Sequence, residues 1–136
     1  MLVNGILNPQ INSLLARVRH TNTLVIADRG FPFWPMIETI DISLVDDIPT
    51  VLQVFQAIRP NFEIGEILMA EEFIKANTPE VCKTFTNAAT HIPLRYQAHT
   101  ELKKLVPGAI GLIRTGDTIQ YANMILVSGP VSSGWG

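Results

Sequence analysis

Short apolar segments that alternate with helical segments are the feature that most constrains the fold of this chain. The apolar segments are bounded by turn-forming residues and are only four to eight residues long, which is typical of buried strands. They cover residues 23–27, 37–44, 62–69, 92–97, 110–114 and 124–127. Period alone does not separate strand from helix at 62–69, and we assign it to a strand. Strands that alternate with helices predict an α/β domain with a mostly parallel sheet covered on both faces.

The helical segments carry recognisable start signals. Asn8 and Pro9 are typical of an N-cap and a first helical residue, and the apolar spacing that follows predicts a helix over residues 9–19. Asp47 and Pro49 open a second segment with helical periodicity, and Thr78 and Pro79 open another. Two further helices are predicted, one over residues 70–77 and one over residues 100–106.

Composition bounds the organisation of the chain. A length of 136 residues fits a single domain, residues 1–136, that ends in a turn-rich tail at 129–136. Hydrophobic residues make up 47% and charged residues only 16%, with a mean hydropathy of +0.25. This is less charged than a typical soluble monomer, so we expect part of the apolar surface to be buried between subunits.

Several classes of partner are disfavoured. The net charge is −2 and the basic residues are scattered, which argues against nucleic acid and anionic lipid. No apolar stretch is long enough to span a membrane, and the first residues lack a signal peptide, so we expect a cytoplasmic protein. One cysteine, Cys82, permits no internal disulfide and too few thiolates for a structural zinc site. Phosphate-binding glycine loops, a GxSxG elbow and HExxH are all absent from the sequence, and we expect neither cofactor nor metal.

Candidate chemistry lies where polar residues follow strands. In open α/β sheets ligands bind beyond the carboxyl ends of the strands, where Asp28 and His99 are placed. His20 closes the first helix, where a cationic side chain would also favour the helix dipole, and Asp28 would also serve as a turn residue. With Tyr121 and Asn123 in a polar loop, these are acid–base and hydroxyl-binding groups without an evident nucleophile.

The sequence resembles a known family over residues 7–128. The similarity begins with LNPQINSLLARVRHTNTLVIADRGFPFWP and continues through IDISL, IPTVLQV, AEE, LRYQAH and RTGDTIQYANMIL. These segments are similar, in the same order, to the D-ribose pyranase family, which includes a fucose mutarotase branch. The resemblance implies a three-layer α/β/α domain with a mostly parallel, mixed sheet. It also implies assembly into rings, commonly a decamer of two pentamers, in which the YAN loop reaches the site of a neighbouring subunit.

The resemblance also implies an activity and a set of site residues. The activity is cofactor-independent ring opening of a free aldose, with ribose as the first expected substrate and fucose as the next. His20 matches the family's general acid/base, and Asp28 could either orient His20 or bind sugar hydroxyls. The implied sugar-binding residues are Asp28, His99, Tyr121, Ala122 and Asn123.

Two departures leave the substrate and the function open. Arg29 stands where family members usually carry a small residue, so it could pair with Asp28, bind an anionic sugar, or be an exposed turn residue. The segment FPFWP is also more aromatic than the pattern of the ribose branch, and its Trp34 could stack on a sugar or pack between subunits. Two alternatives to an enzyme remain at this stage: a sugar-binding sensor subunit for monosaccharide uptake, and a structural ring-forming protein.

Overall fold

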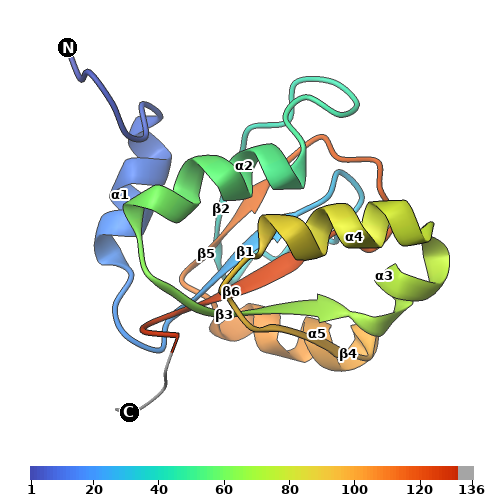
Figure 1. Cartoon of the computed structure of the whole chain (residues 1–136). Coiled ribbons are helices and arrows are strands. Elements are labelled where there is room, and N and C mark those ends of the chain that lie inside the picture. Colours follow the sequence, from blue (N-terminus) through green and yellow to red (C-terminus); the bar gives the residue numbers. More distant parts are fainter. Residues whose placement is uncertain (132–136) are drawn as a thin grey trace.

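A computed structural model describes residues 1–131 and shows one mixed six-stranded sheet. The strand order is β2-β5-β1-β6-β3-β4, and β6 runs antiparallel to both neighbours while the other pairs are parallel. Figure 1 shows the sheet between its helices. The strands are β1 (Thr23–Ala27), β2 (Glu38–Asp41), β3 (Ile64–Ala70), β4 (Leu94–Gln97), β5 (Gly111–Arg114) and β6 (Met124–Ser128). The predicted α/β class and the mixed sheet are confirmed.

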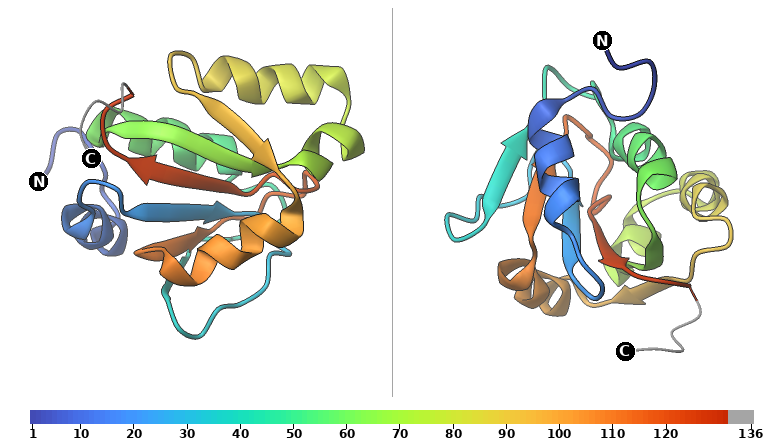
Figure 2. Two further views of the ribbon diagram at one scale, coloured as in Figure 1. Left: turned by 90° about the horizontal axis from the view of Figure 1, so that it is seen from below. Right: turned by 90° about the vertical axis from the view of Figure 1, so that its left-hand side faces the viewer.

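Helices cover both faces of the sheet, as the two views in Figure 2 show. Leu24 and Ile26 of β1 belong to the larger apolar core, which also includes residues of α1, α2, α3 and α4. Val25 and Ala27 point the other way and pack with Leu102 of α5, because successive strand residues face opposite sides. The helices are α1 (Pro9–Arg17), α2 (Val51–Ile58), α3 (Glu71–Ala76), α4 (Pro79–Ala88) and α5 (His99–Leu105). The fold is therefore three-layered.

Several element boundaries differ from the predictions. The α1 helix ends at Arg17 instead of residue 19, because Val18 already has extended backbone. Strand β2 covers four residues of the predicted eight, because the Asp41 carboxylate accepts hydrogen bonds from Ser43 and turns the chain. The α5 helix begins one residue early, at His99.

Residues 43–48 form a tight hairpin in place of the predicted start of a helix. Val45 and Ile48 pair across it, and Asp47 adopts positive φ. The α2 helix begins only after Thr50, whose side chain forms a capping box with Gln53. The hairpin consequently projects beside the carboxyl ends of β2 and β5.

Within residues 1–131, no helix combines the length and the apolar character needed to cross a bilayer. The last five residues of the predicted turn-rich tail, 132–136, lie outside the described part of the chain.

Candidate functional site

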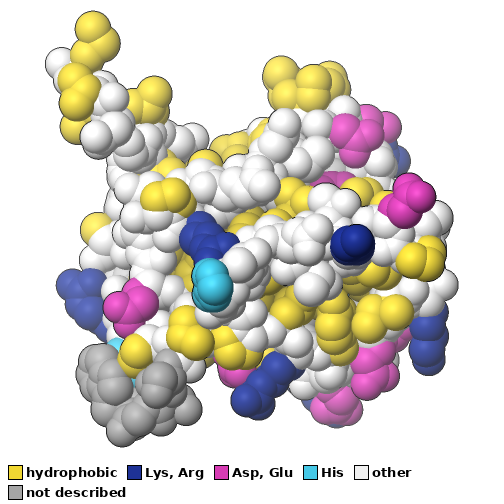
Figure 3. All heavy atoms as spheres, in the orientation of Figure 1, with side chains coloured by type: hydrophobic (Ala, Val, Ile, Leu, Met, Phe, Trp, Pro, Cys, Tyr) yellow, Lys and Arg dark blue, Asp and Glu magenta, His cyan; other side chains and the backbone are white. Residues whose placement is uncertain are grey.

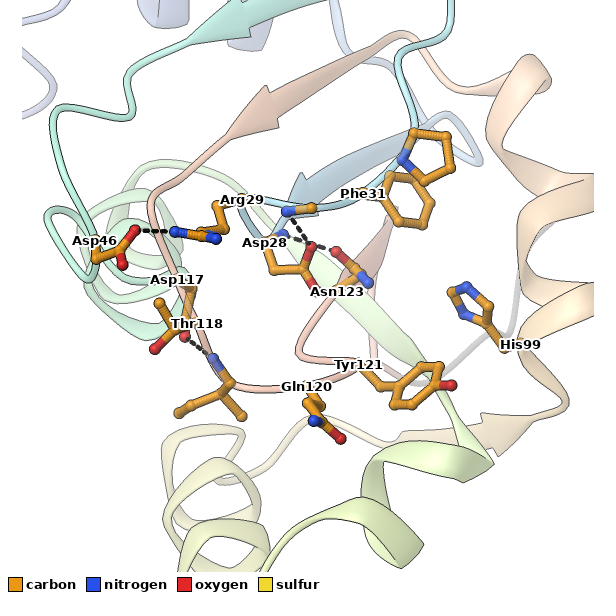
Figure 4. A pocket seen from close by; sticks show the side chains of 13 residues that line it. Asp28, Arg29, Phe31, Asp46, His99, Asp117, Thr118, Gln120, Tyr121 and Asn123 are labelled. Carbon is orange, nitrogen blue, oxygen red and sulfur yellow. Dashed lines mark hydrogen bonds and ion pairs between the residues drawn. The ribbon is translucent and has the colours of Figure 1, made fainter.

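A pocket of about 600 Å³ lies beyond the carboxyl ends of β1, β4 and β5. Its lining comes from the turn after β1, the first residue of α5, the loop between β5 and β6, and the hairpin at 43–48. Parallel strands end at the same edge of a sheet, which is why segments far apart in sequence meet here. Figure 4 shows the labelled side chains around this pocket.

Asp28 and Asn123 form the hydrogen-bonded centre of the pocket. The Asn123 Oδ1 atom accepts a hydrogen bond of 2.7 Å from the Asp28 backbone N–H, and Asp28 Oδ1 accepts one of 3.0 Å from Gly30 N–H. Burial raises the pKa of Asp28, while hydrogen bonds from Gly30, Phe31 and the Asn123 side chain act in the opposite direction. The carboxylate is thus held in one orientation at the pocket wall.

His99 lies across the pocket against two aromatic rings. Its imidazole makes edge contacts with Tyr121 (ring centroids 5.1 Å apart) and Phe31 (6.1 Å). Burial lowers the pKa of His99, and Lys103 lowers it further, against weaker opposing effects of Glu72 and Asp28. The neutral imidazole that this favours carries one hydrogen-bond donor and one acceptor, which suits a sugar hydroxyl.

The loop after β5 supplies pocket residues that the sequence analysis did not single out. Asp117 is 1% exposed, and its carboxylate accepts hydrogen bonds from Val51 N–H (2.9 Å) and Ile119 N–H (2.8 Å). It therefore holds the loop against the N-terminus of α2. The lining residues missed from sequence are Gly30, Phe31, Pro32, Asp46, Asp117, Thr118, Ile119 and Gln120. The turn-forming run TGDT directly after residues 110–114 was the signal that could have found Asp117 and Thr118, because it obeys the same strand-end rule as Asp28.

Arg29 pairs with Asp46 of the hairpin, so the predicted option of a salt bridge with Asp28 is not what the structure contains. Both side chains of the pair are more than half exposed and line the pocket. A second guanidinium, Arg114, lies behind the turn and donates to the carbonyl oxygens of Asp28, Arg29 and Pro32. The turn after β1 is therefore held from both sides.

Ala122 and Trp34 do not line the pocket. The Ala122 side chain is completely buried in the apolar core, so it presents no methyl group to a ligand. Trp34 packs beside Phe31, with ring centroids 6.2 Å apart, in the smaller core. Tyr121 does line the pocket, from a backbone with positive φ of 59°.

His20 is separated from the other predicted site residues of its own chain. It precedes β1, whereas Asp28 follows it, and a five-residue strand spans about 13 Å between its end residues. His20 lies in a different hollow of about 340 Å³, shared with Glu66, Arg95 and Gly129. Asp28 therefore does not orient the His20 ring of the same chain.

Two residues of the YAN loop, Tyr121 and Asn123, line the pocket of their own chain. Asn123 is 3% exposed and bonded to Asp28, and Tyr121 contacts His99. Ala122 and Asn123 are buried within the chain, and the expectation that the loop also reaches the site of a neighbouring subunit stays a prediction. Of the predicted residues, the structure brings together Asp28, Arg29, His99, Tyr121 and Asn123.

The pocket offers a carboxylate, an imidazole, a phenol and an amide at one strand edge. Among residues 1–131 there is no group of three or more His, Cys, Asp or Glu side chains placed to hold a metal ion. The fold and the pocket define a small α/β protein whose site is suited to a ligand with several hydroxyl groups.

Comparison with known proteins gives the family. Residues 1–131 match the sequence profile of the RbsD / FucU transport protein family. A protein named D-ribose pyranase from Geobacillus thermodenitrificans is 40% identical over 129 residues, which is 95% of this chain and 97% of that one. The chain belongs to the RbsD / FucU family.

Solved structures agree with this assignment. Bacillus subtilis RbsD complexed with D-ribose is 34% identical and superposes with a TM-score of 0.87, covering 95% of this chain and 98% of that one. The fucose mutarotase of Streptococcus pneumoniae in complex with L-fucose is 18% identical, with a TM-score of 0.73 and coverage of 90% and 92%. The second likeness shows the shared fold alone.

Proposed function

We propose that this protein is a cofactor-independent sugar isomerase of the pyranase and mutarotase type. It would interconvert ring forms or anomers of a free aldose, with ribose as the first substrate and fucose as the next. The carrying observation is the convergence of Asp28, His99, Tyr121 and Asn123 on one polar pocket. The relatives named D-ribose pyranase and the RbsD structure titled as a ribose complex support ribose as the first choice.

The reaction needs only proton transfer around the ring oxygen. Opening an aldopyranose breaks the bond between the anomeric carbon and the ring oxygen: the ring oxygen receives a proton, the anomeric hydroxyl loses one, and its oxygen becomes the aldehyde oxygen. No bond to carbon other than C–O changes. Reclosure through another hydroxyl gives the furanose, and reclosure on the other carbonyl face gives the other anomer. General acid–base help of about a hundred- to ten-thousand-fold would suffice, since the sugar already reacts slowly in water.

In this mechanism the pocket binds and orients the sugar. Asp28 would accept hydrogen bonds from sugar hydroxyls, while Asn123 holds the Asp28 backbone and the Gly30 N–H holds the carboxylate. His99 and Tyr121 would contribute further hydroxyl contacts from the opposite wall. A site built from such hydrogen bonds discriminates strongly against a sugar that lacks one of the matching hydroxyls.

We assign the general acid/base to His20, delivered by a neighbouring subunit. His20 lies at the far end of β1 from its own chain's Asp28, so a second chain must supply it if it acts at this pocket. The assembly we propose is a cytoplasmic decamer of two pentameric rings. Exposed apolar side chains near the pocket, including Phe33, Leu44 and Val45, supply surface suited to subunit contact.

Saturation-transfer NMR on equilibrated ribose, and then fucose, tests the proposal directly. We expect the protein to accelerate exchange between pyranose and furanose forms, or between anomers. His20→Ala should abolish the acceleration while the ring assembly and ribose binding stay close to those of the wild type. Normal exchange rates in that variant would remove His20 from the mechanism.

A sugar-binding sensor is the second candidate. The separation of His20 from the pocket within one chain favours it, because a binder needs the pocket residues but no acid/base group. Ribose binding without faster exchange, measured in the same NMR experiment, would support the sensor against the isomerase.

A further inference from the structure

The pocket lining carries more negative than positive charge. Its formally charged side chains are Asp28, Asp46, Asp117 and Arg29, so three carboxylates face one guanidinium and leave two net negative charges. Burial lowers the pKa of His99, so its imidazole adds little positive charge at neutral pH. An anionic sugar would therefore meet repulsion unless Arg29 bound its charged group directly.

The Arg29 guanidinium already forms an ion pair with a carboxylate of the pocket. Its Nη1 atom is paired with the Asp46 carboxylate, and Figure 4 shows this pair on the opposite side of the pocket from His99. The other guanidinium nearby, Arg114, is bonded to three backbone carbonyls of the turn after β1 and does not line the pocket. Within the described residues, the cation available to an anionic ligand in this pocket is thus held by Asp46.

Asp46 is placed by the hairpin at residues 43–48, which is anchored to the loop after β5. The neighbouring Asp47 carboxylate accepts hydrogen bonds from Thr118 N–H (3.0 Å) and Thr118 Oγ1 (2.7 Å). The Gly116 N–H donates to the Pro49 carbonyl at 2.9 Å. The Asp46 side chain therefore projects toward Arg29 from a supported backbone, although the pair itself faces solvent.

We infer that the Arg29–Asp46 pair is a charge filter that restricts the pocket to uncharged sugars, with Asp46 as the specificity-determining residue. This inference rests on the proposed function, since it takes the pocket to be the sugar site. It excludes one of the interpretations open for Arg29, because the residue does not bind a sugar anion in the wild-type protein. Removing the Asp46 charge frees the guanidinium and lowers the negative charge of the pocket at the same time.

Two ligands that differ in charge at one position test the filter. Ribose 5-phosphate and 5-O-methyl-ribose are both blocked at the 5-hydroxyl, so neither closes to a pyranose, and they differ in the charge of the 5-substituent. We expect the wild-type protein to bind the phosphate on the order of tenfold more weakly than the methyl ether, as measured by titration calorimetry at low salt. Equal or tighter binding of the phosphate would overturn the inference, and so would failure of the wild-type protein to bind the methyl ether.

The variants isolate the residue responsible. Asp46→Asn should reduce the difference in affinity between the two ligands to about threefold or less. The double variant Asp46→Asn with Arg29→Gln should restore the larger difference. The matched control is Glu38→Gln, which breaks an exposed pair with Arg17 outside the pocket and should leave the difference unchanged. An unchanged difference in Asp46→Asn, or an equal change in Glu38→Gln, would contradict the assignment.

The outcome separates the filter from the proposed function. Accelerated ribose exchange with no preference for the neutral 5-substituted ligand would refute the filter alone. A clear preference without accelerated exchange would refute the isomerase and retain the filter for a sugar-binding protein.

Discussion

At the scale of single residues, His99 depends on Glu72 for its position. The α5 helix has Ala98 at its N-cap and no side-chain cap of its own. Both carboxylate oxygens of Glu72, from α3, instead accept the His99 backbone N–H at 3.0 and 3.2 Å. Glu72 thus acts as a cap supplied by another helix, and its negative charge raises the pKa of His99 against the effect of burial.

Glu72→Gln should lower the pKa of His99 further. Glutamine keeps an oxygen that can accept the His99 backbone N–H, but it removes the charge that favours the imidazolium. The pKa of the His99 ring, followed by NMR titration of its C–H protons, should move downward, away from the ordinary value of 6.5. The neighbouring variant Glu71→Gln, which lacks this contact, should move it much less, and equal shifts in the two variants would refute the role of Glu72.

At the scale of elements, the hairpin at 43–48 and the loop after β5 fit together through a glycine. A Cβ atom placed on Gly116 would lie 2.3 Å from the Val45 carbonyl oxygen and 3.1 Å from that of Ile48. Both obstacles are backbone atoms, so no side-chain rotation relieves the clash. The close approach of these two segments places Asp46 and Thr118 at the same pocket mouth.

Gly116→Ala should therefore lower the free energy of unfolding by about 1–3 kcal/mol, as overpacking of a tight contact does. Urea unfolding measures this loss, and ribose binding should weaken with it because the pocket mouth shifts. Gly108→Ala is the control, since a methyl group added at Gly108 would meet nothing within 4 Å. A free energy of unfolding for Gly116→Ala within error of the control would contradict this prediction, because the hairpin backbone would then shift without loss of stability.

At the scale of the whole molecule, the proposed assembly would account for both the position of His20 and the exposed apolar surface. Figure 3 shows hydrophobic side chains spread over one face and along the N-terminal arm. Exposed fractions reach 70% for Phe33, 76% for Leu44 and 62% for Leu2, which are large values for side chains of this kind. Burial of these groups between subunits would account for the low charge content of the chain.

Mixing inactive variants tests whether the site is shared between chains. His20→Ala and Asp28→Asn should each be inactive as pure assemblies. If the two residues act from different subunits, co-assembly at equal amounts should restore about a quarter of the sites, because that fraction of interfaces receives both intact residues. Exchange NMR on the dissociated and reassembled mixture measures this, and no recovery beyond simple addition of the parent activities would argue for a site within one chain.

The sequence alone determined the fold class, the order of elements and five of the thirteen residues that line the pocket. Apolar segments with turn residues after them mark buried strands by local physics, and the rule that ligands bind beyond strand ends then selects Asp28 and His99. His20, Tyr121 and Asn123 were already candidates as acid–base and hydroxyl-binding groups, and the family resemblance assigned their roles. For His20 that resemblance left undecided which pocket it serves.

Only the tertiary structure decided which residues meet. His20 and Asp28 lie at opposite ends of β1, and the side chain of Ala122 is buried in the core and does not reach the pocket. The hairpin brings Asp46 to Arg29, 17 positions earlier in the sequence. Local propensity carries no information on such contacts, because they depend on strand order and on the path of loops between elements. Periodicity predicts that a strand exists, whereas the packing of the sheet determines which side chains share its edge.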